Sequence, residues 1–186
     1  MIKKKSFFND KVKLFSLKRF QDKRGHFLEF FSKKNLSRLG IKDNFVQDNI
    51  SYSAKKSTIR GLHFQKKPYA QSKILHVISG SIQDIVIDLR KESKFFKKHI
   101  SVELSSKNFE LLYIPEGFAH GFCTLEPKTL VLYKISNFYN KRSEVTIKYN
   151  DKKLNIKWKY KKNQEILSKK DMKGLELKNL NYYFNV

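Results

Sequence analysis

Residues 74–89 read ILHVISGSIQDIVIDL, with one apolar run on each side of Ser79-Gly80-Ser81. Isoleucine and valine favour strands, and a short segment of Gly and Ser between two such runs is typical of a tight turn. The stretch therefore predicts two consecutive strands, 74–78 and 82–89, that are joined as a hairpin.

Short apolar runs of the same kind continue on both sides of this stretch, at spacings near ten residues. Many short strands at such a spacing indicate an all-β barrel or sandwich. We expect further strands at residues 99–104, 110–114, 121–125, 129–135 and 144–148.

Three local signals lie towards the ends of the chain. Asp22-Lys23-Arg24-Gly25 predicts a turn between two strands within residues 11–31. Residues 32–39 predict a short helix that is capped by Ser32 and ended by Gly40. A further helix is expected to begin after Ser168.

The chain of 186 residues fits a single domain, which we expect to span 1–186 with peripheral segments at about 1–12 and 172–186. The N-terminus lacks the apolar part of a signal peptide, and no apolar run approaches the roughly 18 residues of a membrane span. These features predict a cytoplasmic protein with no membrane partner. The one cysteine, Cys123, excludes an intrachain disulfide and a Cys-based zinc site.

The formal net charge is +23, which by itself is typical of nucleic-acid-binding proteins. Of the 40 Lys and Arg residues only six are Arg, and the lysines are scattered along the chain. A surface that reads phosphates favours Arg, whose planar fork binds two oxygens at once, and it gathers the charge in one place. We therefore interpret the lysines as solvated surface and predict no nucleic-acid partner. A basic nucleic-acid-binding barrel is the last-ranked alternative.

A cation and an imidazole lie three residues apart in Thr58-Ile59-Arg60-Gly61-Leu62-His63-Phe64-Gln65. On a regular strand their side chains would point to opposite faces, but Gly61 permits a bulge that turns both into one cavity. An anion clamp beside a proton-transfer group suits acid–base chemistry on an anionic substrate. The alternative, a strand with a core histidine, would bury Arg60 without an anion.

The segment Pro115-Glu116-Gly117-Phe118-Ala119-His120 has the pattern Pro-x-Gly-x-x-His. Pro115 and Gly117 suit a turn, after which His120 would point inward. The pattern resembles the second histidine motif of the cupins, and the resemblance implies a double-stranded β-helix, or jelly-roll, barrel. The alternative is an ordinary proline–glycine turn.

Cupins usually bind a metal through a His-x-His motif and a carboxylate in addition to that later histidine. Here the corresponding segment is His63-Phe64-Gln65, so His63 and His120 leave the metal short of ligands. We predict a metal-free barrel. A metal-dependent cupin, such as an oxygenase, is the alternative.

Other side chains have both a chemical and a structural interpretation. Tyr133 can donate a proton to a carbanion, or be a buried tyrosine bonded to backbone. Asp171 follows Ser168 at capping-box spacing, which favours a helix cap. It can instead accept a hydrogen bond from His63 and raise its basicity, and the two roles would compete for one carboxylate.

Taken together, the motifs resemble the dTDP-4-dehydrorhamnose 3,5-epimerase family of nucleotide-sugar biosynthesis. The resemblance runs from about residue 15 to residue 171. It covers Asp22-x-Arg24-Gly25-x-Phe27-x-Glu29, Gln47-x-Asn49-x-Ser51, the Arg60 to Gln65 segment, Gln71-x-Lys73, Asp88-x-Arg90, the Gly117 to Phe122 segment, Tyr133-Lys134, Asn150-Asp151 and Leu167-Ser168-x-Lys170-Asp171.

The resemblance implies a jelly-roll homodimer without metal or cofactor that acts on dTDP-4-dehydro-6-deoxy-α-D-glucose. It implies that His63 removes protons next to the C4 ketone and that Asp171 orients His63. Lys73 would stabilise the enolate and Tyr133 would return a proton from the opposite face. The implied substrate-binding residues are Arg24, Phe27, Glu29, Gln47, Asn49, Arg60, Asp84, His120, Tyr139, Glu144 and Lys170, of which Arg24, Phe27 and Glu29 would reach a nucleotide across the dimer interface and Tyr139 would stack on the thymine.

One sequence leaves the position of the reaction open. A 3-epimerase or a sugar 3,4-ketoisomerase on a related barrel is the alternative to a double epimerase, although Lys73 and Tyr133 together favour epimerisation at both C3 and C5.

Overall fold

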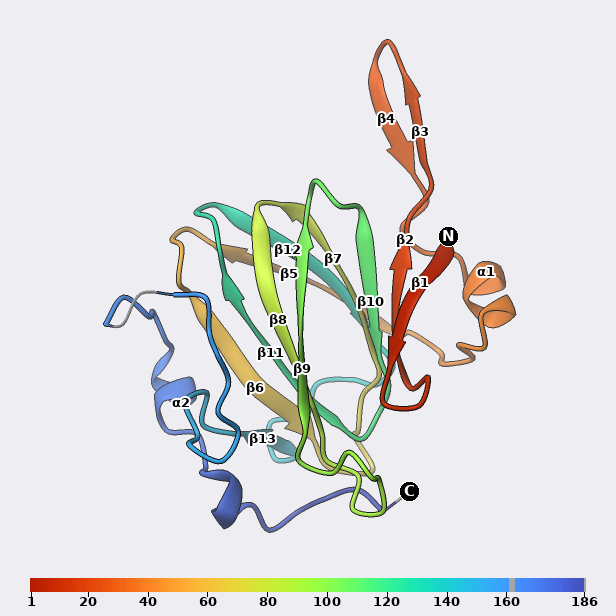
Figure 1. Ribbon diagram of the computed structural model, residues 1–186. Helices are drawn as coiled ribbons and strands as arrows, with labels where there is room; N and C mark the ends of the chain where they lie inside the picture. Colours follow the sequence, from red (N-terminus) through yellow and green to blue (C-terminus); the bar gives the residue numbers. More distant parts are fainter. Residues whose placement is uncertain (161–162, 186) are drawn as a thin grey trace.

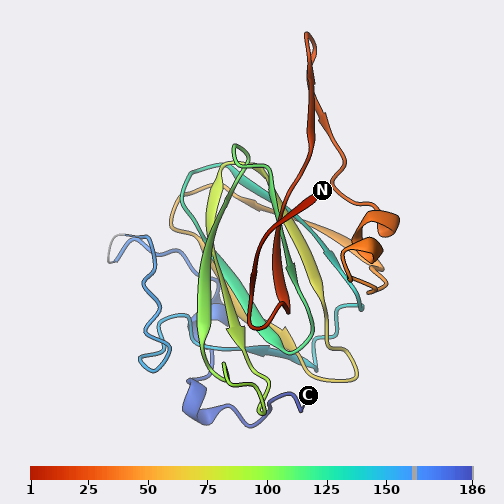
Figure 2. The ribbon, with the colours of Figure 1, turned by 45° about the vertical axis from the view of Figure 1, so that its right-hand side comes forward.

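The computed structural model describes residues 1–160 and 163–185. In this part of the chain two antiparallel sheets pack face to face, and a two-stranded hairpin projects from one end (Figures 1 and 2). In spatial order, the larger sheet comprises β1 (Ile2–Phe7), β2 (Val12–Ser16), β10 (Glu110–Ile114), β7 (Lys73–Ser79), β12 (Thr129–Ile135) and β5 (Gln47–Ser53). The smaller sheet comprises β13 (Glu144–Thr146), β6 (Ile59–Gln65), β11 (Phe118–Thr124), β8 (Ser81–Asp88) and β9 (His99–Ser105).

The predicted hairpin at residues 74–89 is wrong in its pairing, although both strands exist. β7 pairs with β10 and β12, whereas β8 pairs with β9 and β11 in the other sheet. The turn at Gly80 therefore carries the chain from one sheet to the other. Gly80 has φ +79°, and a Cβ there would lie 2.4 Å from the Thr129 hydroxyl oxygen, so the crossing requires glycine. The turn signal is local, but the choice of partner depends on which apolar faces meet.

The space between the sheets is partly filled by apolar side chains. Val77, Leu112 and Val131 from the larger sheet pack with Ile82 and Val86 from the smaller one, and all are buried. This packing closes one part of the barrel. The remaining space holds the cavity described below.

The outer faces of both sheets are also covered. Leu177, Leu180 and Phe184 of the C-terminal segment, which includes the short helices α2 (Lys169–Met172) and η1 (Leu177–Asn179), pack on the smaller sheet. For this reason β8 is buried at every position. The C-terminal segment, which was predicted to be peripheral, thus contributes to the core beside the smaller sheet. At the other end, β1 forms a sheet edge, but the adjoining Phe8 and Val12 are buried.

Two predicted N-terminal features are confirmed. The turn signal Asp22–Gly25 joins β3 (Arg19–Asp22) and β4 (Gly25–Leu28), which form the projecting hairpin (Figure 2). The helix α1 (Lys33–Arg38) begins after Ser32, whose Oγ accepts a hydrogen bond from the Asn35 N–H, and Gly40 follows its end. Leu36 anchors α1 to the outer face of the larger sheet.

A buried ion pair holds the turn that precedes β11. The Asp88 carboxylate is 0% exposed, and the Arg90 guanidinium donates to it at 2.9 and 2.6 Å. The aliphatic part of Arg90 fills the space beside Gly117, where a Cβ would lie 2.7 Å from Arg90 Cγ. The pair therefore supports the turn that directs His120.

We expect Asp88→Asn to lower the free energy of unfolding by about 3–5 kcal/mol, because it leaves a buried guanidinium without its counter-charge. The chain contains a matched control in Asp22, whose carboxylate has the same bonds from Arg24 at the exposed hairpin tip. Asp22→Asn should leave the denaturation midpoint unchanged because solvent screens that pair. If urea unfolding gave the same loss of unfolding free energy for both variants, the Asp88–Arg90 pair would not have the structural role assigned to it here.

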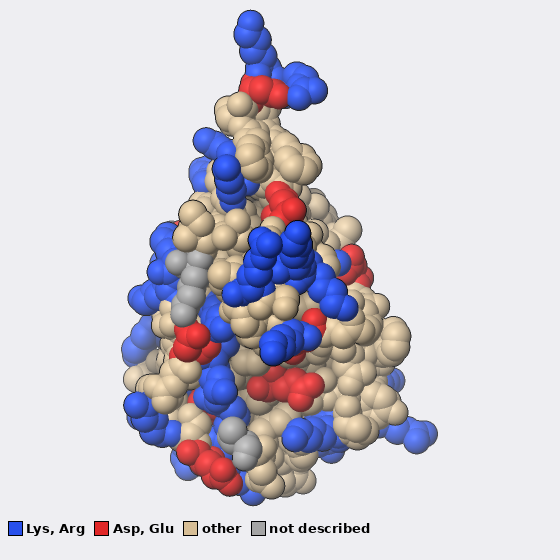
Figure 3. Space-filling view, turned by 90° about the vertical axis from the view of Figure 1, so that its right-hand side faces the viewer, with Lys and Arg blue, Asp and Glu red and all other residues tan. Residues whose placement is uncertain are grey.

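The surface carries the excess of basic residues. On the face shown in Figure 3, Lys and Arg are spread over the molecule, with Asp and Glu interspersed among them. Among the described residues, no helix is long and apolar enough to cross a membrane.

Candidate active site

A cavity of about 890 Å³ opens between the two sheets. Its walls come from both sheets, from α2 and from the loop before β13. Of the residues predicted from sequence, those that line it are Gln47, Asn49, Arg60, His63, Lys73, His120, Tyr133, Tyr139, Glu144, Lys170 and Asp171.

The predicted bulge at Gly61 is confirmed. His63 lies opposite His120 and Phe122 lies opposite Arg60, so β6 has one more residue than β11 between these two pairs. Gly61 has φ +118°, and a Cβ there would lie 2.6 Å from the Gly121 Cα. Only glycine fits this close approach of two backbones, and the extra residue brings both Arg60 and His63 to the cavity.

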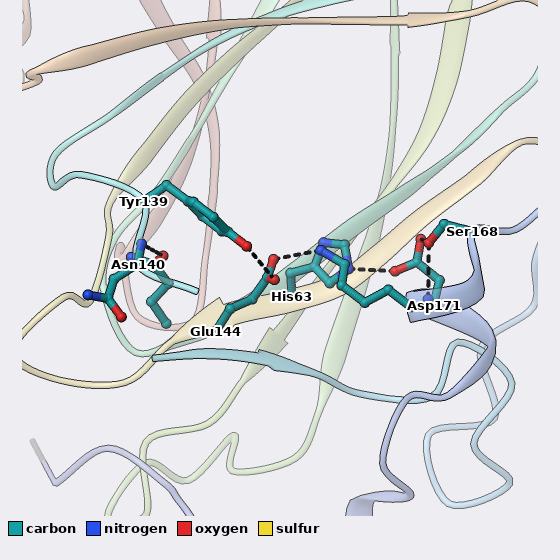
Figure 4. A network of polar contacts seen from close by, with 8 residues as sticks. His63, Tyr139, Asn140, Glu144, Ser168 and Asp171 are labelled. Atoms are coloured by element: carbon teal, nitrogen blue, oxygen red, sulfur yellow. Dashed lines mark hydrogen bonds and ion pairs between the residues drawn. The ribbon is translucent and has the colours of Figure 1, made fainter. Parts of the chain in front are cut away.

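His63 is hydrogen-bonded to Asp171, with 2.6 Å between Nε2 and Oδ1 (Figure 4). Because an ionised carboxylate only accepts hydrogen bonds, Nε2 carries the proton and Nδ1 keeps its lone pair. Burial lowers the pKa of His63 from its ordinary value, and the nearby Lys170 and Lys73 lower it further, against the opposing effect of Asp171. The imidazole is therefore neutral at pH 7 and can accept a proton.

The two roles considered for Asp171 are compatible. Ser168 caps α2 by accepting a hydrogen bond from the Asp171 backbone N–H at 3.1 Å, and its hydroxyl donates to Asp171 Oδ2 at 2.9 Å. The other carboxylate oxygen remains for His63 (Figure 4). Burial opposes ionisation of Asp171, but the bonds from His63 and Ser168 hold its pKa below the ordinary value. The expected competition for one carboxylate does not arise, because each oxygen has its own partner.

His120 faces the cavity and is held from behind by Asp84. Its Nε2 lies 2.8 Å from Asp84 Oδ2. Asp84 is 0% exposed and is not among the residues that line the cavity, so its predicted role in substrate binding would act through the orientation of His120. Burial raises the pKa of Asp84, which His120 and Lys73 oppose.

Lys73 and Tyr133 stand on the opposite wall, on β7 and β12 of the larger sheet. Burial lowers the pKa of Lys73 to about 8, although the charges of Asp84 and Glu144 oppose the shift. Burial also raises the pKa of Tyr133, so its hydroxyl stays protonated at neutral pH. The cavity thus has a neutral base on one wall and a proton donor with an ammonium group on the other.

The outer end of the cavity has a chain of polar contacts centred on Glu144. Tyr139 donates to Glu144 Oε2 at 3.1 Å (Figure 4), and Lys170 Nζ donates to Oε1 at 2.8 Å. Burial opposes ionisation of Glu144, but Lys170 and His63 lower its pKa overall. Tyr139 remains 54% exposed, so its ring is accessible at the cavity.

Comparison with known proteins identifies the family. The model of the dTDP-4-dehydrorhamnose 3,5-epimerase family matches residues 9–179. The chain belongs to this family. It is 43% identical to the dTDP-4-dehydrorhamnose 3,5-epimerase of Shigella flexneri over 173 residues, which are 92% of this chain and 94% of that protein.

Solved structures of epimerases of this family agree with the fold. The enzyme from Bacillus anthracis, with TDP and PPi bound, matches with a TM-score of 0.91 and 46% identity, covering 94% of this chain and 98% of that one. The Legionella pneumophila enzyme, in complex with dTDP-4-keto-L-rhamnose, matches with a TM-score of 0.88 and 38% identity, covering 92% of this chain and 90% of that one. The predicted family, the cupin-type all-β fold and the enzyme class, an epimerase, are confirmed.

Three predicted binding residues of this family member lie away from the cavity. Arg24 and Phe27 are on the projecting hairpin, and Phe27 is 69% exposed. Glu29 follows the hairpin and accepts a hydrogen bond from Asn35 Nδ2 at 2.6 Å. A single copy of the chain therefore does not bring these three residues to its own site.

Sequence reasoning missed four residues with aliphatic hydroxyl or amide side chains that line the cavity, namely Ser51, Gln65, Gln71 and Ser168. All four occur in the motifs quoted for the family, which was a usable signal. Gln65 was interpreted only as the absence of a second metal-binding histidine. Two of its three hydrogen bonds are to Phe138 and Asn140, which are more than 70 residues away, and no local pattern encodes such contacts.

Proposed function

We propose that this chain inverts C3 and C5 of dTDP-4-dehydro-6-deoxy-D-glucose and yields dTDP-4-dehydro-L-rhamnose. The observation that carries the proposal is the division of proton-transfer groups between two walls of one cavity. His63 stands on β6 of the smaller sheet, and Tyr133 stands on β12 of the larger sheet. Inversion requires that a proton leaves one face of a carbon and returns at the other, and this arrangement suits both steps.

The reaction uses the acidity that the C4 ketone confers on the neighbouring C–H bonds. His63 Nδ1 takes the proton, and the electron pair moves to the ketone oxygen as an enolate. The ammonium group of Lys73 stabilises that oxygen while charge develops on it. The enolate then collapses, and the carbon takes the Tyr133 hydroxyl proton on its opposite face. His120, which Asp84 holds in place, binds the sugar from the same wall as His63.

The nucleotide end of the substrate fits the outer part of the cavity. Arg60 supplies the fixed positive charge for the diphosphate and is itself held by the Tyr52 carbonyl at 2.8 Å. Gln47 and Asn49, which are hydrogen-bonded to each other at 2.8 Å, contact the sugar nucleotide from β5. Glu144 and Lys170 do so from the opposite side, and the exposed ring of Tyr139 stacks on the thymine.

The projecting hairpin supports a homodimer in which Arg24, Phe27 and Glu29 reach the cavity of a second copy. Phe20 and Phe27 are exposed and lie side by side, with 6.4 Å between their ring centroids. An aromatic pair of this kind on a projecting arm is typical of a surface that is covered in an assembly. Light scattering should give the mass of two chains, and a stable, active monomer would contradict this part of the proposal.

The direct test is incubation with the 4-dehydro nucleotide sugar in heavy water. Deuterium should enter at both C3 and C5, as followed by proton magnetic resonance. Absence of label at both positions would reject the proposed reaction. Label at C3 alone would identify a 3-epimerase.

We expect Tyr133→Phe to separate exchange from inversion. The variant retains His63 and Lys73, so it should still exchange protons with solvent, but it lacks the hydroxyl that protonates the opposite face. Its rate of completed inversion at C5 should fall by about 10²-fold or more. Normal inversion by the variant would show that another group donates the proton.

The rate should depend on pH in a bell-shaped manner. The value of kcat/KM should rise with pH through the pKa of His63, which burial holds below its ordinary value, because the base must be unprotonated. It should fall as Lys73 loses its proton near its pKa of about 8. In Lys73→Arg, whose side chain stays charged, the residual activity should have no alkaline limb near pH 8. If the activity of Lys73→Arg still decreased near pH 8, a group other than Lys73 would cause that decrease.

A further inference from the structure

Gln65 ends β6 two residues after His63, and its side-chain amide is fully engaged. Nε2 donates to the backbone carbonyls of Tyr69 at 2.6 Å and Phe138 at 3.1 Å. Oε1 accepts a hydrogen bond from the Asn140 backbone N–H at 2.7 Å. The residue is 4% exposed, so these bonds have little competition from water.

Two of the three backbone partners of Gln65 lie on either side of one aromatic residue. Phe138 and Asn140 flank Tyr139, whose own hydroxyl is hydrogen-bonded to Glu144. The backbone of Tyr139 is therefore held from both sides by an amide that is covalently attached to the strand of His63. Figure 4 shows Tyr139 and Asn140 together on one side of His63, with Asp171 on the other.

The clamp also extends to Glu144. The Asn140 carbonyl accepts hydrogen bonds from the N–H groups of Ser143 and Glu144, each at 3.1 Å, and its side-chain oxygen accepts a bond from Ser143 N–H at 3.0 Å. Asn140 thus begins a tight turn that leads into β13. A shift of Asn140 would move Tyr139 and Glu144 together.

We infer that Gln65 is a positioning residue that holds the loop of Tyr139 at a set distance from His63 and so determines how tightly the nucleoside end of the substrate binds. The inference rests on the proposed function, in which Tyr139 stacks on the base. Gln65 acts through Tyr139 and does not take part in proton transfer.

The chemistry of the site requires an amide. Two carbonyl oxygens and one N–H must be satisfied at once, and among side chains of this length only glutamine has two donors and an acceptor on one planar group. A methionine fills a similar volume but removes the hydrogen-bond partner of all three backbone groups. A glutamate turns an oxygen towards two carbonyl oxygens, which repels both loops.

The chain contains a closely matched control in Gln83 on β8. This side chain is 2% exposed and also makes three bonds, donating to Ser101 Oγ at 3.0 Å and the Lys157 carbonyl at 2.9 Å and accepting from the Lys159 N–H at 2.6 Å. It ties a loop to the outer side of the smaller sheet and does not line the cavity. Gln83→Met therefore reproduces the loss of stability without the proposed loss of positioning.

The test compares Gln65→Met with Gln83→Met in thermal melting, steady-state kinetics and calorimetric titration with dTDP and with inorganic pyrophosphate. We expect similar decreases in Tm. Only Gln65→Met should raise KM and the Kd for dTDP, by roughly tenfold, the effect of losing one base–aromatic stack. Its kcat should change less than threefold, and pyrophosphate, which has no base, should bind both variants as it binds the wild type. Equal kinetics in the two variants, or equal weakening of dTDP and pyrophosphate, would overturn the inference.

A second comparison asks whether Gln65 acts through Tyr139. In a Tyr139→Ala background, Gln65→Met should weaken dTDP binding by less than about twofold, because the group that it positions is already absent. A full additional loss would show that Gln65 contacts the ligand by another route. Where Gln65→Met folds poorly, Gln65→Glu, which keeps the side-chain volume, should give the same selective loss of dTDP affinity.

The outcomes separate this inference from the proposed function. A wild-type protein that binds dTDP but incorporates no deuterium would reject the epimerase reaction, whereas the dTDP titrations would still decide the role of Gln65. A wild-type protein that is active, with Gln65→Met indistinguishable from Gln83→Met, would reject the inference alone.

Discussion

His63→Asn is expected to abolish turnover and solvent exchange at both C3 and C5, with kcat reduced by about 10³-fold or more. Asparagine is polar but shorter than histidine, and it has no lone pair that is basic at neutral pH. Because the proposed mechanism uses one imidazole at both carbons, neither C3 nor C5 should take up deuterium in heavy water. The Tm should change little, since His63 borders the cavity and is not part of the apolar core.

His99 provides the control for this substitution. It lies on β9, at the edge of the smaller sheet and outside the cavity lining, so His99→Asn should leave exchange and turnover unchanged. Retention of normal exchange by His63→Asn would mean that a different group removes the proton. Loss of exchange at only one carbon would mean that two bases are used.

The second large effect is expected for Asp171→Asn, with a decrease in kcat of about 10²- to 10⁴-fold. The amide can donate a hydrogen bond to His63 Nε2, which favours the tautomer that carries its proton on Nδ1. The nitrogen that must accept the substrate proton would then be occupied. Helix α2 should remain capped, because the cap is made by the backbone N–H of residue 171 and the hydroxyl of Ser168.

Ser168→Ala separates the cap from the orientation of the base. It removes the cap of α2, which should cost about 1 kcal/mol of stability, but it leaves the carboxylate beside His63. We therefore expect a measurable decrease in Tm with less than tenfold loss of kcat, the reverse of the Asp171→Asn pattern. If Asp171→Asn retained more than a tenth of the wild-type kcat, the carboxylate would be no more than a helix-cap partner.

The positions of many elements follow from local sequence signals. The strands predicted at 110–114 and 129–135 have those bounds in the structure, and α1 lies between its predicted cap and its glycine. Such signals are local because a strand pattern or a helix cap depends on a few adjacent residues. The residues around the cavity were likewise predictable from motifs that are continuous in sequence.

Pairing between elements could not be predicted in the same way. Nothing in residues 74–89 indicates that the turn at Gly80 crosses from one sheet to the other, since a glycine between two apolar strands is compatible with both a hairpin and a crossing. The outcome depends on which strands lie beside β7 and β8, and these come from residues 99–135. Asp84 illustrates the same limit. Its side chain is bonded to His120, which lies on the neighbouring strand β11, and the pairing of β8 with β11 could not be predicted from either segment.

The family, the β-strand content and the chemical types of the reacting groups were present in the amino-acid order of this chain, because motifs and apolar periodicity are local properties. Three features required the folded chain: the opposition of His63 and Tyr133 across two sheets, the division of the Asp171 carboxylate between His63 and Ser168, and the clamp of Gln65 on the loop of Tyr139. The first and third features join residues that are separated by long stretches of chain. The second depends on which partner bonds to which oxygen of one carboxylate. Long-range packing sets such distances, and no short segment of sequence encodes them.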